Sequence, residues 1–487
     1  MSTIPEISVA PGDGIGPEIT DAVVFILKEA GARVSMDHIV IGKQIYEQGI
    51  SSGISDQAWE SIRRTKVLLK GPITTPQGGG YKSVNVTARK TLGLFANVRP
   101  VRSFAPFVKT PFPGMDLVIV RENEEDTYGG IEHQQTDEVV QCLKLITRPG
   151  TERVVRYAFE YAVANQRKKV HCLSKDNIMK LTDGLFHKVF NEIATEYPSI
   201  QNDHMIIDIG TAKVAADPLR FDVIVTPNLY GDIISDVAAE VSGSVGLAGS
   251  ANIGVSAAMF EAVHGSAPDI AGQNIANPSG LLNGAILMLL HLGQADVAEL
   301  IQNAWLTAVE DGMHTRDIKS DTYTKQVLGT KEFAQAVVDR LGKKPHTLAP
   351  AVHAKTEIHM DKVLHSHTQA SIEAKKAPKT LKGVDIFLDW DQENRNPAIL
   401  GKHLESIAGP DFRLSMISNR GTKVYPDGAP ETYCTDHWRC RFVGENPSNP
   451  SIVELLSRVT KANLEVIKTE NLYEFGGQAG YSKGQGE

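Results

Sequence analysis

From residue 1 to about residue 340, short β-branched runs alternate with stretches of helical periodicity. The strand-like runs lie at 4–9, 67–69, 117–120, 169–173, 205–209 and 222–225. Helical patterns lie at 18–30, 151–164 and 177–196. This alternation predicts an α/β fold: a doubly wound, largely parallel sheet with helices on both faces.

The composition changes after residue 340. Residues 341–380 are rich in Lys, His, Ala and Pro and have no clean period, which predicts a linker with room for a short helix. Its irregularly spaced histidines favour a solvated segment over a metal site: His346, His353, His359, His365 and His367. Residues 381–487 then show strand and helix patterns in the order β-α-β-β-α-β, that of a ferredoxin-like α+β domain. The sequence thus divides into 1–340, 341–380 and 381–487.

Charge and cysteine content exclude several classes of protein. The 487 residues carry 50 Lys and Arg against 58 Asp and Glu, a net charge of −8, which argues against nucleic acid as the main partner. No run of about 18 apolar residues predicts a membrane span, and the start lacks the pattern of a secretory signal. The 4 cysteines form no CxxC motif, so we expect a cytoplasmic protein.

A glycine-rich loop follows the first predicted strand. It reads Gly12-Asp13-Gly14-Ile15-Gly16-Pro17 and opens the first predicted helix. A Rossmann dinucleotide fingerprint needs its third glycine where Pro17 stands. A tight turn with proline in the first helical turn is therefore the favoured interpretation.

Several arginines stand at the ends of predicted strands or in the loops beyond them, among them Arg89, Arg99 and Arg121. Guanidinium groups pair carboxylates in a bidentate way, so this set suits a small ligand with more than one carboxylate. Surface ion pairs would explain the same spacing equally well.

Two aspartates, Asp232 and Asp236, are spaced so that a helix places both carboxylates on one face. Asp208, at the end of a predicted strand, would complete an oxygen site for Mg²⁺ or Mn²⁺. Helix capping by Asp232 is the alternative. Further on, the segment from His264 to Gly272 is rich in small residues, which suits either a flat ligand or a turn with a buried histidine.

These segments, in this order, resemble the isocitrate and isopropylmalate dehydrogenase family. The resemblance covers residues 1 to about 340 and is carried by Gly-Asp-Gly-Ile-Gly-Pro-Glu, Arg-Glu-Asn-Glu-Glu-Asp-Thr-Tyr, Asn-Leu-Tyr-Gly-Asp-Ile-Ile-Ser-Asp and His-Gly-Ser-Ala-Pro. The C-terminal block, with Asp436-His-Trp-Arg-Cys-Arg-Phe, resembles the appended domain of the larger bacterial isocitrate dehydrogenases. The implied fold is the family's own, with large and small subdomains.

The resemblance also implies the residues of the site. Those in contact with substrate are Thr75, Ser83, Asn85, Arg89, Arg99, Arg121 and Asn177. Tyr128 and Lys175 would transfer protons, and Asp208, Asp232 and Asp236 would hold the metal ion. The cofactor would lie against His264, Gly265, Ser266, Ala267, Asp269, Ile270 and Asn277. Lys175, Asn177 and Asp208 would come from the neighbouring subunit, which implies a homodimer or a higher homo-oligomer.

The implied reaction is the metal-dependent oxidative decarboxylation of isocitrate to 2-oxoglutarate and CO₂, with hydride transfer to NAD(P), as in the tricarboxylic acid cycle. Ser83 and Asn85 suit the extra carboxylate of isocitrate, whereas an isopropyl group needs an apolar wall. The alternative is a related enzyme acting on isopropylmalate, homoisocitrate or tartrate.

The cofactor prediction depends on Asp269, which follows the His-Gly-Ser-Ala-Pro motif. An aspartate accepts a hydrogen bond from a ribose 2′-hydroxyl and repels a 2′-phosphate, so NAD is favoured over NADP. Arg316 and Lys319 could still reach a phosphate. A second kind of function, RNA binding by Trp438 and Phe442 on the C-terminal sheet, is less favoured than a strand with alternating core and surface residues.

Overall fold

The structure is a computed structural model that describes residues 4–75, 83–353, 358–365 and 377–484. The chain forms two compact units. Unit 1 comprises residues 1–128, 145–178 and 183–366, and unit 2 comprises 129–144, 179–182 and 367–487. Residues 76–82 of the glycine-rich segment and His367 of the predicted linker lie outside the described residues.

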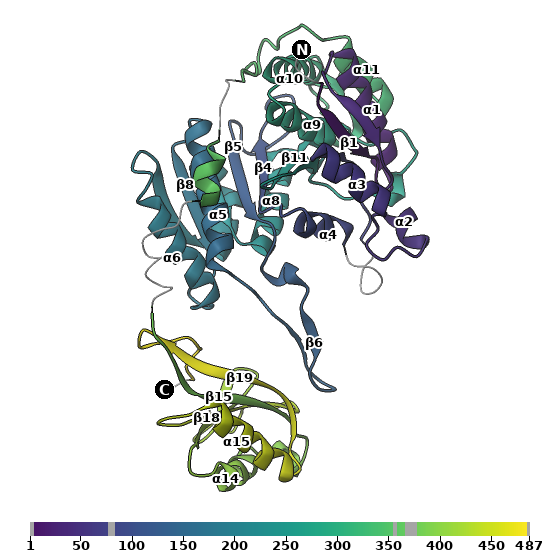
Figure 1. Ribbon diagram of the computed structural model, residues 1–487. Helices are drawn as coiled ribbons and strands as arrows, with labels where there is room; N and C mark the ends of the chain where they lie inside the picture. The colour runs from purple at the N-terminus through teal and green to yellow at the C-terminus, as the bar shows by residue number, and fades with distance from the viewer. Residues whose placement is uncertain (1–3, 76–82, 354–357, 366–376, 485–487) are drawn as a thin grey trace. The chain divides into compact units, whose positions relative to one another are not determined.

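Unit 1 is built on a ten-stranded sheet with the order β2-β1-β3-β12-β11-β4-β5-β10-β8-β9 (Figure 1). The strands are β1 (Glu6–Ala10), β2 (Ser35–His38), β3 (Val67–Lys70), β4 (Ala96–Arg102), β5 (Asp116–Glu122), β8 (Lys169–Ser174), β9 (Gln201–Ile206), β10 (Val223–Thr226), β11 (Gly249–Ile253) and β12 (Ala258–Ala262). Strand β11 is antiparallel to β12 and β4, and β4 is antiparallel to β5. The other neighbours are parallel, which confirms the predicted α/β fold with a largely parallel sheet. The antiparallel centre was not predicted.

Helices flank this sheet (Figure 1). They are α1 (Gly16–Glu29), α2 (Lys43–Glu47), α3 (Asp56–Thr65), α4 (Val84–Thr91), α5 (Arg148–Ala164), α6 (Thr182–Ala194), α7 (Ile207–Ala216), α8 (Asn228–Ser242), α9 (Ser279–His291), α10 (Ala295–Glu310), α11 (Thr330–Val338) and α12 (Met360–His365). The short strands β13 (Met313–His314) and β14 (Gln326–Val327) pair with each other. Trp305 of α10 is fully buried and packs edge-on against Phe104, with ring centroids 4.8 Å apart.

The glycine loop before α1 makes a turn in which the backbone passes very close to other segments. Gly12 has φ +73°, and a Cβ there would lie 2.2 Å from the carbonyl oxygen of Pro72. At Gly14, with φ +60°, a Cβ would lie 2.0 Å from the carbonyl oxygen of Ser266. Only glycine fits such positions, so these residues serve a close backbone approach inside the fold.

Two predicted elements differ from the structure. The strand expected at 205–209 ends at Ile206, and α7 begins at Ile207, so Asp208 lies in the first turn of a helix. The β-branched isoleucines suggested a strand, but an acidic residue is favoured in a first helical turn because it faces the positive end of the helix dipole. The helix expected from residue 177 begins only at Thr182.

The C-terminal part of unit 2 is an α+β domain with an antiparallel sheet in the order β17-β16-β18-β15-β19-β20. Its elements are β15 (Lys379–Asp389), α14 (Pro397–Ile407), β16 (Arg413–Asn419), β17 (Thr422–Tyr425), β18 (His437–Val443), α15 (Asn449–Lys461), β19 (Glu465–Phe475) and β20 (Gln478–Ala479). The expected β-α-β-β-α-β order is confirmed, with β17 and β20 as additions. Trp438 and Phe442 are fully buried in its core, so the structure contradicts their use as RNA-stacking platforms.

A hairpin formed by β6 (Glu132–Gln134) and β7 (Val140–Cys142) belongs to the same unit as the C-terminal domain. The hydroxyl of Thr136 donates to Asp436 at 2.6 Å. Glu138 forms an ion pair with Arg395 at 2.9 Å, although more than 250 residues separate them in sequence. The hairpin is therefore held by contacts that reach across the sequence.

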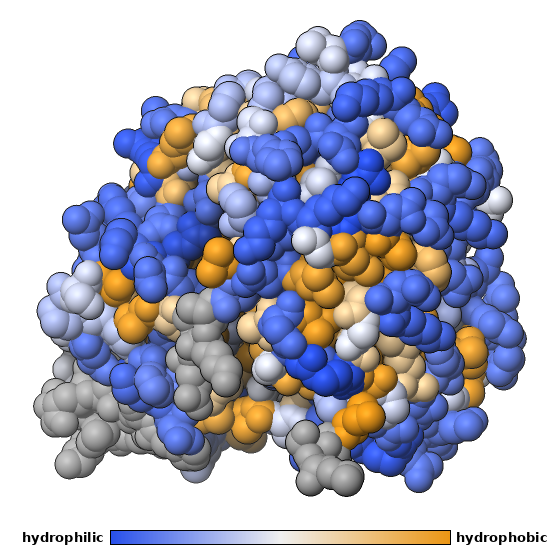
Figure 2. All heavy atoms as spheres, turned by 90° about the horizontal axis from the view of Figure 1, so that it is seen from above, coloured by the Kyte–Doolittle hydropathy of each residue, from blue (hydrophilic) through white to orange (hydrophobic). Residues whose placement is uncertain are grey.

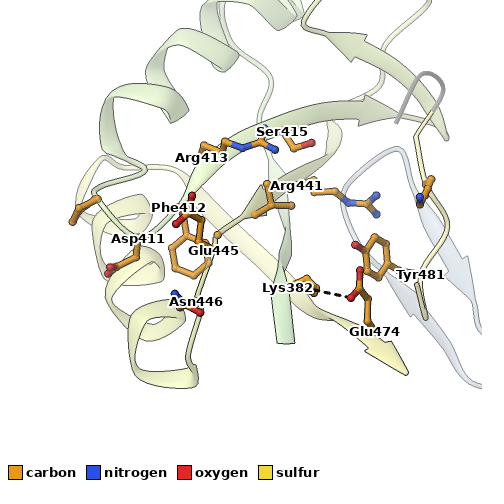
Figure 3. Close-up of a pocket in the computed structure, with 14 residues that line it drawn as sticks. Lys382, Asp411, Phe412, Arg413, Ser415, Arg441, Glu445, Asn446, Glu474 and Tyr481 are labelled. Atoms are coloured by element: carbon orange, nitrogen blue, oxygen red, sulfur yellow. Dashed lines mark ion pairs between the residues drawn. The ribbon is translucent and has the colours of Figure 1, made fainter. Parts of the chain in front are cut away.

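Unit 2 also contains a cavity of about 890 Å³ beside β16, β18 and β15 (Figure 3). Its lining has mixed charge: Arg441 binds Asp385 at 2.8 Å, Lys382 lies 3.4 Å from Glu474, and Arg413, Lys483, Asp411 and Glu445 line it as well. The lining therefore favours no single ligand charge.

On the face drawn in Figure 2, hydrophilic residues predominate and hydrophobic residues form separate patches. Among the described residues, no helix is both long enough and apolar enough to cross a membrane.

Candidate active site

Strands β4 and β5 and helix α8, which pack together in unit 1 (Figure 1), bring two arginines to one aspartate. Arg99 on β4 donates to Asp232 at 3.2 Å and lies 3.9 Å from Asp236. Its Nε hydrogen bonds to Asn97, and its guanidinium also donates to Ser235. The side chain is 4% exposed, so its position is fixed by packing as well as by these bonds.

Arg121, at the end of β5, forms an ion pair with the same Asp232. Two of its nitrogens donate to Asn228 Oδ1, at 2.9 and 2.7 Å. The ring of Tyr128 lies 4.8 Å from the Arg121 guanidinium, and the Tyr128 hydroxyl donates to Asp232 Oδ2 at 2.6 Å. We call Arg99, Arg121, Tyr128 and Asp232 the arginine cluster.

The arginine cluster shifts the proton affinities of its members. Burial acts to raise the pKa of Asp232, but Arg121 and Arg99 outweigh burial and the pKa is lowered. Burial, together with repulsion from Arg99 and Arg89, lowers the pKa of Arg121 to about 10. The pKa of Tyr128 is raised, mainly by burial, so this phenol stays protonated in the protein as it stands. Arg121 and Arg89 act to lower this pKa, but burial outweighs them.

A second buried ion pair lies next to Arg89 of α4. Glu261 of β12 accepts from Arg89 at 2.8 Å and lies 2.6 Å from the ammonium of Lys70. Asn252 also donates to Glu261, at 2.8 Å. The sequence analysis gave no role to Lys70 or Glu261. The weak signal was that each charge stands at or next to the end of a strand of otherwise apolar residues.

Helix α4 carries the predicted substrate-reading residues. Ser83 is its N-cap and accepts from the Thr75 hydroxyl at 3.3 Å. The side-chain oxygen of Asn85 is buried, as is Nε of Arg89, and neither has a hydrogen-bond partner among the described residues. Because buried polar atoms are normally satisfied, these two point to a ligand on this face of the helix.

Among the described residues, no hydrogen bond or ion pair joins Lys175, Asn177 or Asp208 to the arginine cluster. Lys175 follows β8 and donates to Asp208 at 2.6 Å. The side chains of Lys175 and Asp208 are 27% and 68% exposed, and Asn177 is exposed as well. We call Lys175, Asn177 and Asp208 the exposed group.

The carboxylates of Asp232 and Asp236 fit a Mg²⁺ or Mn²⁺ ion, because both ions prefer oxygen ligands. Repulsion from Asp232 adds to burial in raising the pKa of Asp236, against the pull of Arg99. Among the described residues, Asp208 does not join these two in a group of three ligands within 4.8 Å. One chain therefore brings together only part of the predicted metal set.

The predicted cofactor loop borders a cavity of about 690 Å³ in unit 1. Its lining includes five of the seven predicted residues, namely His264, Gly265, Ala267, Ile270 and Asn277. Burial lowers the pKa of His264, so its ring is neutral at pH 7. The hydroxyl of Ser266 is 2.7 Å from that of Thr74, and it serves the packing of the loop rather than the lining.

Asp269 is exposed and does not line this cavity, whereas Arg316 and Asp317 do. Asp317 is itself engaged, since it accepts from Ser244 at 2.7 Å and Asn277 at 2.9 Å. The cavity lining therefore includes the cation of Arg316 and not the carboxylate of Asp269.

Comparisons with known proteins agree with this geometry. The family model for isocitrate/isopropylmalate dehydrogenase matches residues 6–337, and that for the bacterial isocitrate dehydrogenase C-terminal domain matches 379–487. A Rickettsia bellii protein named isocitrate dehydrogenase [NADP] is 56% identical over the whole of both chains. The crystal structure of the TT0538 protein from Thermus thermophilus superposes with a TM-score of 0.91 at 44% identity, covering 99% of this chain and 96% of that one.

The preference for NAD, and the unspecific assignment to NAD(P), are corrected by these relatives. The Rickettsia bellii relative, which matches over its full length, is named for NADP. Subunit 2 of the isocitrate dehydrogenase [NAD] of Saccharomyces cerevisiae is 46% identical, and the match covers 69% of this chain and 90% of that one. The physical reason is the position of Asp269: its residue type suits a ribose hydroxyl, but the fold places it outside the cavity.

The two family models together cover most of the chain, and the catalytic one alone spans more than half of it. The arginine cluster, the paired aspartates and the small-residue loop occur in the order that the sequence motifs indicated. The chain belongs to the isocitrate/isopropylmalate dehydrogenase family.

Proposed function

We propose that this protein catalyses the metal-dependent oxidative decarboxylation of isocitrate to 2-oxoglutarate and CO₂, with NADP as the hydride acceptor. The observation that carries the proposal is the convergence of Arg99 and Arg121 on Asp232, with the Tyr128 hydroxyl on the same carboxylate. Arginines held this firmly are suited to the carboxylates of a small polyanion. Asp232, which lies among these arginines, is suited to bind a metal ion that also contacts the substrate.

Three arginines account for the charge of the substrate. Arg99 and Arg121 are locked by other hydrogen bonds, so they bind carboxylates with little loss of side-chain entropy. Arg89 has a buried Nε that no described residue uses, and Asn85 on the same helix has an unpartnered oxygen. These two support a preference for isocitrate, because a purely apolar substituent would leave both of them unsatisfied.

Tyr128 is the residue we assign to proton transfer within this chain. Its raised pKa keeps the phenol protonated, and its hydroxyl is 2.6 Å from Asp232, so a proton is held at a fixed position. Lys175 is the candidate for the second proton transfer. A bound Mg²⁺ or Mn²⁺ would supply Lewis acidity at the hydroxyl of the substrate and would be held by Asp232 and Asp236, with Asp208 from the neighbouring subunit.

The dimer is part of this proposal. Exposed isoleucines stand near both halves of the site in sequence: Ile178, 68% exposed, and Ile209, 48%, near Lys175 and Asp208, and Ile233, 53%, next to Asp232. Large apolar side chains gathered beside polar site residues are typical of an interface. A second copy of the chain would cover them and bring the exposed group to the arginine cluster of its partner.

We also propose the division into a catalytic part at 1–340, a linker at 341–380 and a C-terminal domain at 381–487. A cytoplasmic location is part of the same proposal, supported by four free thiols at Cys142, Cys172, Cys434 and Cys440.

The test is a substrate panel. Values of kcat/KM should be measured for isocitrate, isopropylmalate, homoisocitrate and tartrate with NADP and with NAD, in the presence of Mg²⁺. We expect isocitrate with NADP to give the highest value. A higher value for any other hydroxyacid contradicts the assignment of substrate, and a higher value with NAD contradicts the assignment of cofactor.

A further inference from the structure

One group of metal-ligating side chains has no place in the reaction described above. Asp176, His187 and His204 each offer a ligand atom, and these three atoms lie within 4.8 Å of one another. They come from three elements of unit 1: the loop after β8, helix α6 and strand β9. Figure 1 shows β8 and α6 in the same part of that unit.

The contacts inside this group are short. The carboxylate of Asp176 is 2.7 Å from Nδ1 of His187 and 3.8 Å from Nε2 of His204. The two imidazole rings stack with centroids 3.6 Å apart. The buried hydroxyl of Ser174 is 2.9 Å from Nε2 of His204 and orients that ring.

The surroundings suit a metal ion as well. The three side chains are between 17% and 25% exposed, so an ion would be partly shielded and still accessible from solvent. Burial and the neighbouring His187 lower the pKa of His204, which keeps the imidazole in the neutral form that binds metals. The carboxylates of Asp176 and Asp203 act in the opposite direction and raise the pKa of His204, but by less.

We propose that Asp176, His187 and His204 form a second divalent-metal site, selective for Zn²⁺, Co²⁺ or similar ions. Two imidazoles and one carboxylate leave room for water as a fourth ligand, as in tetrahedral sites of this kind. Imidazole ligands favour these ions over Mg²⁺, which prefers oxygen. Ligand atoms on one tetrahedral ion are about 3–3.5 Å apart, so Nε2 of His204, which is 3.8 Å from the Asp176 carboxylate, must move closer when the ion enters.

Such an ion would act on the exposed group. Asp176 stands between Lys175 and Asn177 in sequence, and His204 precedes Asp208 by four residues. An ion bound here would link the loop after β8 to the end of β9 and restrain the Lys175–Asp208 contact. That consequence rests on the proposed function, whereas the binding of the ion does not.

The experiment measures Co²⁺ binding to the chelator-treated full-length protein in excess Mg²⁺. Wild type is compared with the double variant His187→Gln/His204→Gln and with a control, His133→Gln/His403→Gln, in which two exposed histidines are replaced. We expect wild type and control to retain one Co²⁺ per chain, with the visible absorption of a nitrogen-ligated ion. The double variant should lose both the bound Co²⁺ and this absorption. Equal retention and equal spectra in the double variant, or no retention by wild type, would overturn the proposal.

A second measurement covers the case in which the double variant does not fold. Wild-type protein is treated with diethyl pyrocarbonate with and without Zn²⁺, and modified histidines are identified by mass spectrometry. Zn²⁺ should protect His187 and His204 and leave His133 unprotected. Equal modification of all three with and without Zn²⁺ contradicts the site. Because neither measurement uses isocitrate, failure of the proposed reaction leaves both readouts intact.

Discussion

The arginine cluster and the exposed group are two halves of one proposed site, and they are built differently. Side chains of Arg99 and Arg121 are 4% and 1% exposed and are held by several hydrogen bonds each. Lys175 and Asp208 are 27% and 68% exposed, and Lys175 reaches Asp208 through a single contact. The buried half is already in a binding geometry, whereas the exposed half is what a separate chain can carry to it.

This difference has an energetic reason. A fixed arginine loses little freedom when the substrate binds, but burying its charge is costly and requires partners on every side. A lysine in solvent needs no such support, and it becomes buried only when a second chain covers it. The comparison therefore predicts that the two halves respond to substitution in different ways.

The largest effect should follow the loss of Arg121. We expect Arg121→Met to lower kcat/KM for isocitrate by about 10²–10³-fold, because a fixed charge at the substrate is lost and Asp232 loses its closest partner. Steady-state kinetics will measure this. The control is Arg33→Met, which removes a surface ion pair with Asp296 and should leave kcat/KM unchanged. Near-normal activity in Arg121→Met would contradict the role of the arginine cluster in substrate binding.

Next in size is the stability carried by Glu261. Replacing it with Gln leaves Lys70 and Arg89 without their carboxylate, and breaking a buried pair costs about 3–5 kcal/mol. Chemical denaturation will measure the loss. Asp208→Asn is the matched change on the exposed half, and it should leave the midpoint of unfolding of the isolated chain unchanged. An equal loss in both variants contradicts the contrast.

The same pair gives a dependence on pH. Burial alone would raise the pKa of Glu261, but Lys70 and Arg89 outweigh it and the pKa falls well below its ordinary value of 4.5. A lowered pKa means that the unfolded chain binds the proton first as the pH falls. The contribution of Glu261 is therefore complete above pH 4.5 and is lost as the solution becomes more acidic. In Glu261→Gln, this part of the dependence of the free energy of unfolding on pH should disappear.

The exposed half should show its role in association. We expect Ile209→Asp to weaken dimerisation by about tenfold or more, because it places a charge among side chains that a partner would bury. Analytical ultracentrifugation will measure the dissociation constant. Ile399→Asp on α14, where Ile399 is 45% exposed, is the control and should not change it. Identical constants for both variants would remove the proposed interface.

The smallest effect, and the sharpest test, uses mixed dimers. Arg121→Met and Lys175→Met should each be inactive alone. After mixing and subunit exchange, half of the dimers combine one chain of each kind, and one of their two sites is intact. The expected recovery is about a quarter of wild-type activity. No recovery, with exchange verified by mass spectrometry, places both residues in a site within one chain.

Much of the fold could be predicted from the sequence, because the relevant signals are local. Strand β10 and helix α5 follow their hydrophobic periods, and Gly31 ends α1 with the positive φ that a helix end needs. The paired aspartates were found because a helical spacing of four residues places them together. Arg121 stood out because it directly follows the apolar run of β5, whereas Arg99 lies in the middle of β4.

What the sequence could not supply depended on distant contacts. Lys70 and Glu261 are separated by 190 intervening residues, and only the neighbouring strands β3 and β12 make them a pair. Asp269 has the chemistry of a ribose ligand, but the turn that starts at Ala267 with φ +37° directs the chain so that Asp269 lies outside the cavity. In each case the position of the residue followed from tertiary structure, which its residue type does not give.

The hairpin at 129–144 has a consequence for the order of synthesis. Its partners Arg395 and Asp436 leave the ribosome only after some 250–300 further residues. At about 5–20 residues per second, that wait lasts on the order of 10–60 s. Tyr128 stands directly before the hairpin, so the chain segment that follows this phenol lacks its contacts with Arg395 and Asp436 during that time. A nascent chain can therefore complete most of unit 1 long before the residue we assign to proton transfer has both of its flanks anchored.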